Sequence, residues 1–379
     1  MTLFKKINLR IKQMTIIVIL YACKIMSLFT KKEHWVVSER GYDARDNGYF
    51  FYKYLASKHP ELKVYYLINK KSADYSKVKD NAVAYGSLKS FWLLASCKKI
   101  ISTHYALICP NMSPKLFKVS GLYKKFYFLQ HGIIQNSLAF LYAQSAPMRL
   151  FVCGAKPEYD FVKENFGHPE GVVQYTGLAR YDNLDNANVK KQILVMPTWR
   201  QYIRTEEEFL TSEYYESYSR LISNEKLIKK LEEKNIDLVF YPHYEVQKWI
   251  KHFSSKSKNV IIASFEEYDV QALLKQSALL ITDYSSVFFD FAYMGKPVVY
   301  FQFDKEDFFD KHYQKGYFDY LTMGFGPVFK ENDEVAEYAI DMIEEGLNQK
   351  QEYQKRIEGF FALRDKNNCE RIYQAIIQN

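Results

Sequence analysis

The sequence predicts an α/β protein built from two doubly wound, Rossmann-like domains that face each other across a cleft and follow an N-terminal membrane-associated helix. Three observations support this prediction. Short apolar runs alternate with helical patterns along the whole chain, as in parallel sheets covered by helices. A polar segment without periodicity, residues 179–191, divides these alternations near the middle. The 379 residues are enough for about two α/β domains with complete cores.

The first 32 residues form a basic arm with seven basic and no acidic side chains: Lys5, Lys6, Arg10, Lys12, Lys24, Lys31 and Lys32. Its apolar run, residues 14–23, is interrupted by Lys24 and resumes at residues 25–29. A spanning helix needs about 20 uninterrupted apolar residues. The pattern therefore favours an amphipathic helix lying on the anionic cytoplasmic face of the cell membrane, as in a peripheral protein. A short span and a cleaved signal are the alternatives.

The remainder of the chain is nearly neutral, with 45 basic and 44 acidic residues. Because nucleic-acid binding needs a basic face, no nucleic-acid partner is predicted. The five cysteines include no C-x-x-C pair and the histidines form no spaced cluster, which argues against a disulfide framework and a zinc site. Glycine-rich nucleotide loops are absent as well. We therefore expect no metal and no cofactor.

Two domains follow the arm, at residues 33–185 and 186–379. The first, an acceptor domain, has strand candidates at residues 35–38, 64–68, 99–102, 126–129 and 150–153, with a helical pattern at residues 47–58. The second, a nucleotide-donor domain, has strand candidates at residues 193–196, 238–240, 260–262, 279–281 and 298–300. Helical patterns at residues 333–377 complete it, although in such folds the last helix often crosses back to the first domain. Ligands of such sheets bind beyond the carboxyl ends of the strands.

The most informative stretch is residues 278–304, ALLITDYSSVFFDFAYMGKPVVYFQFD. It has the pattern of a β-α-β unit, with a polar turn between the first strand and an aromatic helix. Asp283 or Ser285 can cap that helix, which leaves backbone N–H groups and the hydroxyls of Ser285 and Ser286 at its positive end. The turn is thus a candidate phosphate site, with an ordinary helix cap as the alternative.

Three other strand ends carry candidate residues. His131 follows a strand and precedes Gly132, and a neutral imidazole there is suited to act as a general base. Arg200, with Thr198 beside it, has the group best shaped to bind phosphate. His243 ends a strand of the second domain and, when protonated, would stabilise a leaving phosphate. The alternatives are structural histidines and a surface ion pair.

These motifs, in this order, resemble the CDP-glycerol glycerophosphotransferase family, the teichoic acid primases and polymerases. The resemblance rests on QHG at residues 130–132, MPTWR at 196–200, YPH at 241–243, and TDYSS and GKPVV within 282–299. It covers residues 35–379 and implies the GT-B architecture. The chain departs from the family where no lysine follows Gly132, and where Lys315 replaces a frequent arginine.

The resemblance implies transfer of a polyol phosphate, glycerol phosphate foremost, from a CDP-activated donor to an acceptor hydroxyl, with release of CMP. His131 is the implied base and His243 assists the leaving group. The resemblance further implies that the donor and its phosphates are bound by a larger set of residues: Thr198, Arg200, Asp283, Ser285, Ser286 and Lys315.

The expected partners are CDP-glycerol or CDP-ribitol, a lipid-linked saccharide or polyol-phosphate acceptor, and an anionic membrane surface. Two other functions fit the same features. One is a glycosyltransferase of this fold that uses a nucleotide sugar. The other is an inactive membrane-bound scaffold in polysaccharide assembly. No motif residue measures the length of the polyol, so glycerol and ribitol, like primase and polymerase, stay open.

Overall fold

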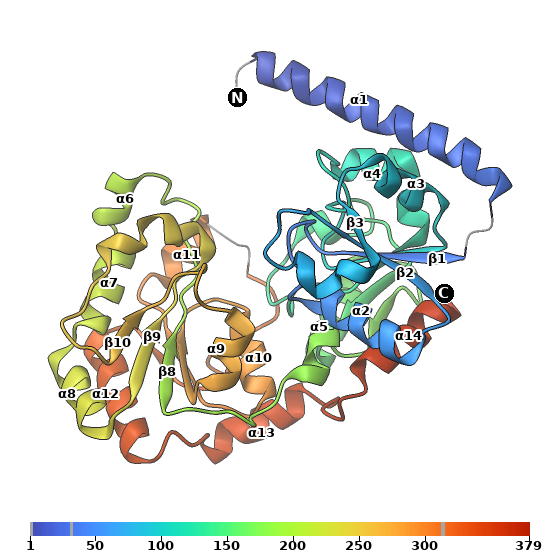
Figure 1. Ribbon diagram of the computed structural model, residues 1–379. Coiled ribbons are helices and arrows are strands. Elements are labelled where there is room, and N and C mark those ends of the chain that lie inside the picture. Colours follow the sequence, from blue (N-terminus) through green and yellow to red (C-terminus); the bar gives the residue numbers. More distant parts are fainter. Residues whose placement is uncertain (1–2, 31–32, 312–314) are drawn as a thin grey trace. The chain divides into compact units, whose positions relative to one another are not determined.

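The computed structural model describes residues 3–30, 33–311 and 315–379 (Figure 1). The chain forms two compact units, each with its own parallel sheet. Unit 1 consists of residues 1–133, 138–183 and 363–379, and unit 2 of residues 134–137 and 184–362. The predicted boundary after residue 185 lies two residues from the division after residue 183. The C-terminal residues 363–379, predicted to belong to the second domain, pack in unit 1 instead.

Unit 1 has a seven-stranded sheet in the order β3-β2-β1-β4-β5-β6-β7, with every neighbouring pair parallel. Its strands are β1 (His34–Ser38), β2 (Lys63–Ile68), β3 (Ala82–Ala84), β4 (Lys99–Ser102), β5 (Phe126–Phe128), β6 (Leu150–Cys153) and β7 (Val173–Tyr175). The five predicted strands are all present. The edge strands β3 and β7 were missed because three residues are too few to show a pattern.

The helices of unit 1 are α2 (Asn47–Lys58), α3 (Leu88–Ser96), α4 (Pro114–Ser120), α5 (Lys156–Asn165) and α14 (Asn368–Gln378), with the short η5 (Ala179–Asn183) before the division. Helices α2 and α14 pack together on one face of the sheet, and α3 and α4 lie on the other (Figure 1). The strand order turns back between β1 and β4, so their carboxyl ends are where a doubly wound sheet binds ligands.

Unit 2 has a six-stranded parallel sheet in the order β10-β9-β8-β11-β12-β13. Its strands are β8 (Gln192–Val195), β9 (Asp237–Phe240), β10 (Val260–Ile262), β11 (Leu279–Thr282), β12 (Val298–Phe301) and β13 (Val328–Phe329). Its helices are α6 (Glu206–Leu210), α7 (Glu213–Ile222), α8 (Glu225–Lys234), α9 (Val270–Gln276), α10 (Val287–Tyr293), α11 (Lys305–Lys311), α12 (Asn332–Glu344) and α13 (Gln351–Phe360). Only the two-residue β13 was not predicted.

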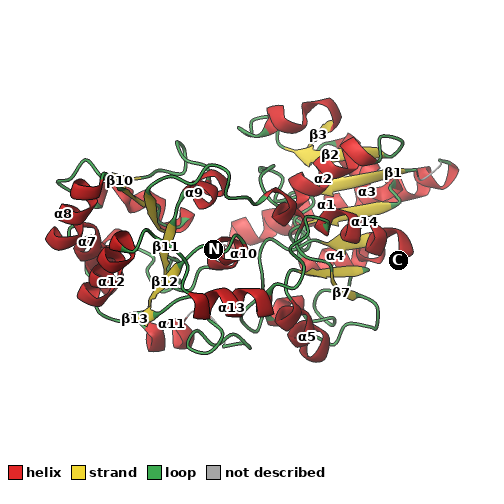
Figure 2. Ribbon diagram, turned by 90° about the horizontal axis from the view of Figure 1, so that it is seen from below, coloured by secondary structure: helices red, strands yellow, loops and turns green. Residues whose placement is uncertain are grey.

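Helices cover both faces of this second sheet, with α7, α8 and α12 on one side and α9 and α10 on the other (Figures 1 and 2). Strands β8, β11 and β12 are accordingly buried at every residue, as expected for a parallel sheet between two helical layers. Much of the aromatic content packs here. The ring of Phe288 packs against those of Tyr300 and Phe318, and both of these also pack against Tyr320. The ring centroids of these four pairs lie 5.0–5.3 Å apart. The aromatic turn helix α10 is therefore part of the core.

The return of the chain to unit 1 has a polar and an apolar cause. Asp182 accepts hydrogen bonds from the backbone N–H groups of Asn368 and Cys369, at 2.9 and 2.8 Å, and so anchors the start of α14. The helix then buries Cys369, Ile372 and Ile376. This apolar face requires a partner, and unit 1 supplies it.

The N-terminal helix α1 (Leu3–Met26) packs on α3 and α4 through a face that includes the buried Ile16 and Leu20 (Figure 1). The helix continues through Lys24, so the interruption of the apolar run does not break it. Residues 7–29 have a mean hydropathy of 1.6 and meet the length and composition of a membrane span. A signal sequence or a soluble core helix meets the same criterion.

The GKPVV motif has a structural lysine. Lys296 is buried, and its Nζ donates to the carbonyls of Leu274, Lys275 and Ser277 at 2.9, 2.7 and 2.9 Å. These groups lie at the carboxyl end of α9, where a helix leaves carbonyls without partners. The ammonium thus ties α9 to the strand that follows α10.

We expect Lys296→Met to lower the free energy of unfolding by about 2–3 kcal/mol, because it leaves buried carbonyls unpaired. Urea unfolding followed by tryptophan fluorescence measures the effect. Lys275→Met is the control: Lys275 Nζ pairs with the half-exposed Asp185, and its removal should cost less than about 1 kcal/mol. Equal stabilities for the two variants would contradict the assignment.

Candidate active site

A buried ion cluster joins the carboxyl ends of three neighbouring strands of unit 2. Arg200, after β8, is 1% exposed. Its Nη1 contacts Asp283 Oδ2, after β11, at 2.8 Å, and its Nε contacts Asp304 Oδ2, after β12, at 2.6 Å. Arg200 Nη2 also donates to Asp304 Oδ1 at 3.0 Å. Burial opposes the charge of Arg200, but the two carboxylates outweigh it and hold the pKa of the guanidinium well above its usual value.

The carboxylates of this cluster have further donors. Asp283 Oδ1 accepts the backbone N–H groups of Thr198 and Tyr284 at 2.8 and 2.6 Å. Tyrosine hydroxyls add to both carboxylates: Tyr218 donates to Asp283, and Tyr202 and Tyr284 donate to Asp304, over 3.1–3.3 Å. The cluster therefore fixes the MPTWR and TDYSS turns against each other. Its predicted members Arg200, Asp283 and Thr198 come together, but they face one another inside the domain.

Thr198 nevertheless keeps one group for a ligand. Its side chain is 8% exposed, and Thr198 Oγ1 has no hydrogen-bond partner in the part of the chain that the structure describes. A buried hydroxyl without a partner is costly, so this atom favours a ligand that brings one.

Ser285 and Ser286 lie half-buried on the turn between β11 and α10. The carboxylate of Asp283 is held by Arg200 and two backbone N–H groups, and Ser286 occupies the N-cap position of α10 without a side-chain cap bond. Within the described ranges, neither serine hydroxyl makes a hydrogen bond. The capping alternative from the sequence is therefore not what the structure shows, and both hydroxyls are available to an anion.

His243 follows β9 and lies half-buried against Trp199, with ring centroids 6.1 Å apart and nearly parallel planes. His243 Nδ1 accepts the backbone N–H of Glu245 at 3.2 Å, which caps the short helix η6 (Tyr244–His252). An imidazole that accepts at Nδ1 carries its proton on Nε2 and is neutral. In this arrangement His243 is a neutral donor through Nε2–H, whereas the sequence-based interpretation made it a cation.

Lys315 is exposed, directly after residues outside the described ranges, and it lies near Asp319. The next residue, Gly316, has to be a glycine for steric reasons, because a Cβ there would lie 2.3 Å from the Gln135 carbonyl oxygen. The side chain of Gln135 donates to the Tyr284 carbonyl at 2.6 Å and accepts the hydroxyl of Tyr320 at 2.8 Å. The segment after QHG thus holds the loop that carries Lys315 beside the TDYSS turn.

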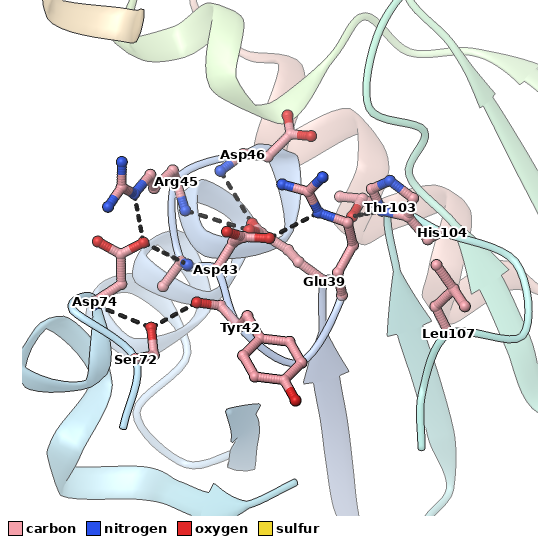
Figure 3. A network of polar contacts seen from close by, with 12 residues as sticks. Glu39, Tyr42, Asp43, Arg45, Asp46, Ser72, Asp74, Thr103, His104 and Leu107 are labelled. Carbon is pink, nitrogen blue, oxygen red and sulfur yellow. Dashed lines mark hydrogen bonds and ion pairs between the residues drawn. The ribbon is translucent and has the colours of Figure 1, made fainter. Parts of the chain in front are cut away.

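Unit 1 contributes a hollow of about 160 Å³ in which every lining side chain is polar: Glu39, Arg40, Asp43, Arg45, Asp46, His104 and His131. They follow β1, β4 and β5, and Figure 3 shows the polar network around Glu39. The carboxylate of Glu39 accepts three backbone N–H groups, those of Arg45, Asp46 and Tyr49, at 2.9–3.2 Å. This arrangement shapes the loop from β1 to α2.

His131 has an exposed side chain at this hollow, and one ring N–H donates to the backbone carbonyl of Thr103. His104 stacks on it, with ring centroids 4.7 Å apart. Desolvation by the surrounding protein lowers the pKa of His131, with Arg180 and Arg40 acting in the same direction and Asp46 opposing them. The ring is therefore neutral at pH 7, and its second nitrogen has a lone pair for a proton.

Glu39, Asp46 and His104 were missed in the sequence, although a signal was present. Each follows a strand that was predicted, β1 or β4, and these two strands flank the point where the strand order turns back. Applying the strand-end rule to every strand, instead of to familiar motifs alone, would have found them.

The two parallel-sheet α/β units give the chain a fold of the GT-B class. More particularly, the chain belongs to the CDP-Glycerol:Poly(glycerophosphate) glycerophosphotransferase family, whose model matches residues 19–378. The resemblance seen in the motifs is thus confirmed.

Relatives agree with this assignment. The chain is 34% identical over 373 residues to the minor teichoic acid biosynthesis protein GgaB of Bacillus subtilis (strain 168). The matched region covers 93% of this chain and 41% of GgaB. It therefore spans less than half the length of that relative. It is 25% identical over 240 residues to the teichoic acid glycerol-phosphate primase of the same strain, covering 57% of this chain and 58% of the primase.

Solved structures show the same fold. The wall teichoic acid polymerase TagF matches with a TM-score of 0.68 at 17% identity, over 100% of this chain and 98% of that chain. The S. aureus MnaA-UDP structure matches with a TM-score of 0.56 at 12% identity, over 91% of this chain and 98% of that chain. The predicted fold class, two parallel-sheet α/β domains of the GT-B kind, is confirmed.

We expect Arg200→Met to lower the free energy of unfolding by about 3–5 kcal/mol, because it leaves two buried carboxylates without their cation. The control is Arg204→Met on the same loop: Arg204 is exposed, and its loss should cost less than about 0.5 kcal/mol. Urea unfolding measures both. An Arg200→Met protein as stable as the wild type, with donor affinity lost, would show that the arginine serves the ligand directly.

Proposed function

We propose that this chain transfers glycerol phosphate from CDP-glycerol to a hydroxyl of a lipid-linked or polymeric teichoic acid acceptor and releases CMP. The observation that carries the proposal is the family match over residues 19–378 together with the strand-end clustering of its motif residues. Two relatives are named as a teichoic acid poly(glycerol phosphate) polymerase and a teichoic acid glycerol-phosphate primase. One structure of TagF is of a variant soaked with CDPG.

Unit 2 binds the donor in this proposal. Ser285 and Ser286 offer two hydroxyls to the pyrophosphate, and Thr198 Oγ1 offers a third polar group. The neutral Nε2–H of His243 donates to a phosphate oxygen and stays with it as negative charge develops on the leaving CMP. Arg200 and Asp283 act from inside the domain by holding the two turns in place. Lys315 adds an exposed positive charge.

Unit 1 binds the acceptor, with its hydroxyl in the polar hollow beside His131. The Thr103 carbonyl fixes the His131 tautomer, so the other ring nitrogen takes the proton of that hydroxyl. The acceptor oxygen forms a bond to the β-phosphorus of CDP-glycerol. The bond from this phosphorus to the bridging oxygen breaks, and CMP leaves with that oxygen.

His131→Ala should lower kcat by at least about 100-fold and leave the Kd of CDP-glycerol nearly unchanged, because the base acts on the acceptor. CMP release and calorimetric titration measure the two quantities, and His59→Ala, whose ring stacks on Tyr373, is the control. Near wild-type turnover would remove His131 from the mechanism. Parallel assays with CDP-ribitol and a nucleotide sugar identify the donor, and turnover of only the sugar would favour the glycosyltransferase alternative.

The arm has a membrane role in the same proposal. The α1 stripe, defined as Ile7, Ile11, Met14, Val18, Tyr21 and Ile25, is exposed along the face opposite Ile16 and Leu20. The spacing alternates between four and three residues, so these side chains form one continuous row. Arg10, Lys12 and Lys24 are exposed on the same helix. Such a helix suits the interface of an anionic cytoplasmic leaflet, with the stripe in the acyl boundary.

Met14→Glu/Val18→Glu should reduce sedimentation with anionic vesicles by at least about 10-fold more than Asn8→Glu/Thr15→Glu. Both pairs add the same charge on exposed positions of α1, but only the first interrupts the stripe. High salt should partly release the wild type, because charge is screened and apolar contact is not. Equal losses would make the contact purely electrostatic, and extraction by detergent alone would favour a span.

A further inference from the structure

His131 follows a residue with an unusual backbone. Gln130 has φ = +59° and is not a glycine, and such a strained conformation persists only where neighbouring groups enforce it. Gln130 is also 1% exposed. The amide of Asn47 donates to its carbonyl at 2.9 Å. Its side-chain Nε2 donates to the Val152 carbonyl and, at 3.1 Å, to the carboxylate of Glu158.

The carbonyl of His131 itself is held as well. Arg180 Nη1 donates to it at 2.9 Å and contacts Asp46 Oδ1 at 2.7 Å. The Arg180 side chain is 5% exposed and that of Asp46 is 25% exposed, so the guanidinium is shielded from water while the carboxylate keeps partial access to it. The backbone N–H of Arg180 donates to the side-chain carbonyl of Asn47 at 2.9 Å, so the start of α2 and the segment η5 act together. Both peptide carbonyls around His131 are therefore fixed.

We propose that Arg180, held by Asp46, is a positioning residue for His131: the pair fixes the peptide that carries the imidazole and places two opposite charges beside the ring. The inference rests on the proposed role of His131 as the general base. Neither Arg180 nor Asp46 belongs to the motifs that identify the family in this chain.

The two charges have opposite effects on the ring. Arg180 and Arg40 lower the pKa of His131 and Asp46 raises it, beyond the lowering by desolvation. The other groups facing the hollow are Glu39, Asp43, Arg45 and His104. Burial, with the charge of Asp46, raises the pKa of Glu39 to about 8, and burial lowers that of His104 to about 2, so neither carries much charge near pH 7. Asp43 pairs with Arg40 at 2.7 Å.

The test uses Asp46→Asn and Arg180→Gln in the full-length protein. A neutral base gives kcat/KM an acid limb at its pKa. We expect Asp46→Asn to move this limb to lower pH and Arg180→Gln to move it to higher pH, each by about half a unit to one unit. Arg180→Lys should return the limb toward wild type, because it restores the positive charge. Its kcat should nevertheless be about 10-fold lower than that of the wild type, because lysine lacks the planar guanidinium that binds two acceptors at once. Arg149→Gln, an exposed arginine that donates to the Asn379 backbone, should change neither.

A second readout does not depend on turnover. The imidazole of His131 is followed by NMR titration of histidine-labelled protein, with its signal identified by loss in His131→Ala. Opposite shifts in Asp46→Asn and Arg180→Gln support the inference even if His131→Ala retains activity, a result that overturns the proposed base alone. Shifts of the same sign, or none in either folded variant, overturn the inference. If Arg180→Gln fails to fold, a shift to lower pH in Asp46→Asn with little shift in Arg180→Lys supports the inference, and no shift in Asp46→Asn overturns it.

Discussion

The buried contact between Arg200 and the carboxylates of Asp283 and Asp304 is the constraint on which the proposed donor site depends. Two anions and one cation inside a protein are stable only when the remaining lone pairs have donors. Backbone N–H groups and three tyrosine hydroxyls supply them. The outcome is a rigid base at the ends of β8, β11 and β12. The cluster uses the carboxylate of Asp283 internally, and Ser286 at the N-cap of α10 makes no side-chain cap bond, so within the described ranges the two serine hydroxyls are available to an anion.

The acceptor side follows a similar plan with different groups. A loop anchored by Glu39 leads into α2, and α2 contributes Asn47 to the turn that displays His131. Arg180 joins this turn to Asp46. On both sides, an ion pair beneath a strand-end turn holds it in place, while the groups proposed to meet the substrate, apart from Lys315, are uncharged hydroxyls and imidazoles. Because the ionised groups hold the turns, the hydroxyls and imidazoles are already in position before the substrate binds. This positioning of the reacting groups is the main requirement of phosphoryl transfer.

The sequence predicted ten strands, and it located His131, Arg200, His243 and the TDYSS turn, because each follows a strong apolar run. It could not predict that Arg200 would be buried, since a guanidinium after a strand has the same pattern whether its partner is a phosphate or two distant aspartates. Asp304 lies 104 residues away from Arg200, and only the parallel pairing of β8, β11 and β12 brings them together. The contact between Arg180 and Asp46 could not be predicted for the same reason, because these residues are 134 positions apart in the sequence. Short edge strands and the return of residues 363–379 depended on tertiary packing as well.

We propose that Arg200 organises the donor site from within the domain and that Ser285 and Ser286 contact the phosphates. A crystal structure of the protein with CDP-glycerol tests it most directly. We expect pyrophosphate oxygens within about 3 Å of Ser285 and Ser286 Oγ, with Arg200 still bound to both carboxylates. A guanidinium that leaves Asp283 or Asp304 to bind the pyrophosphate would contradict it.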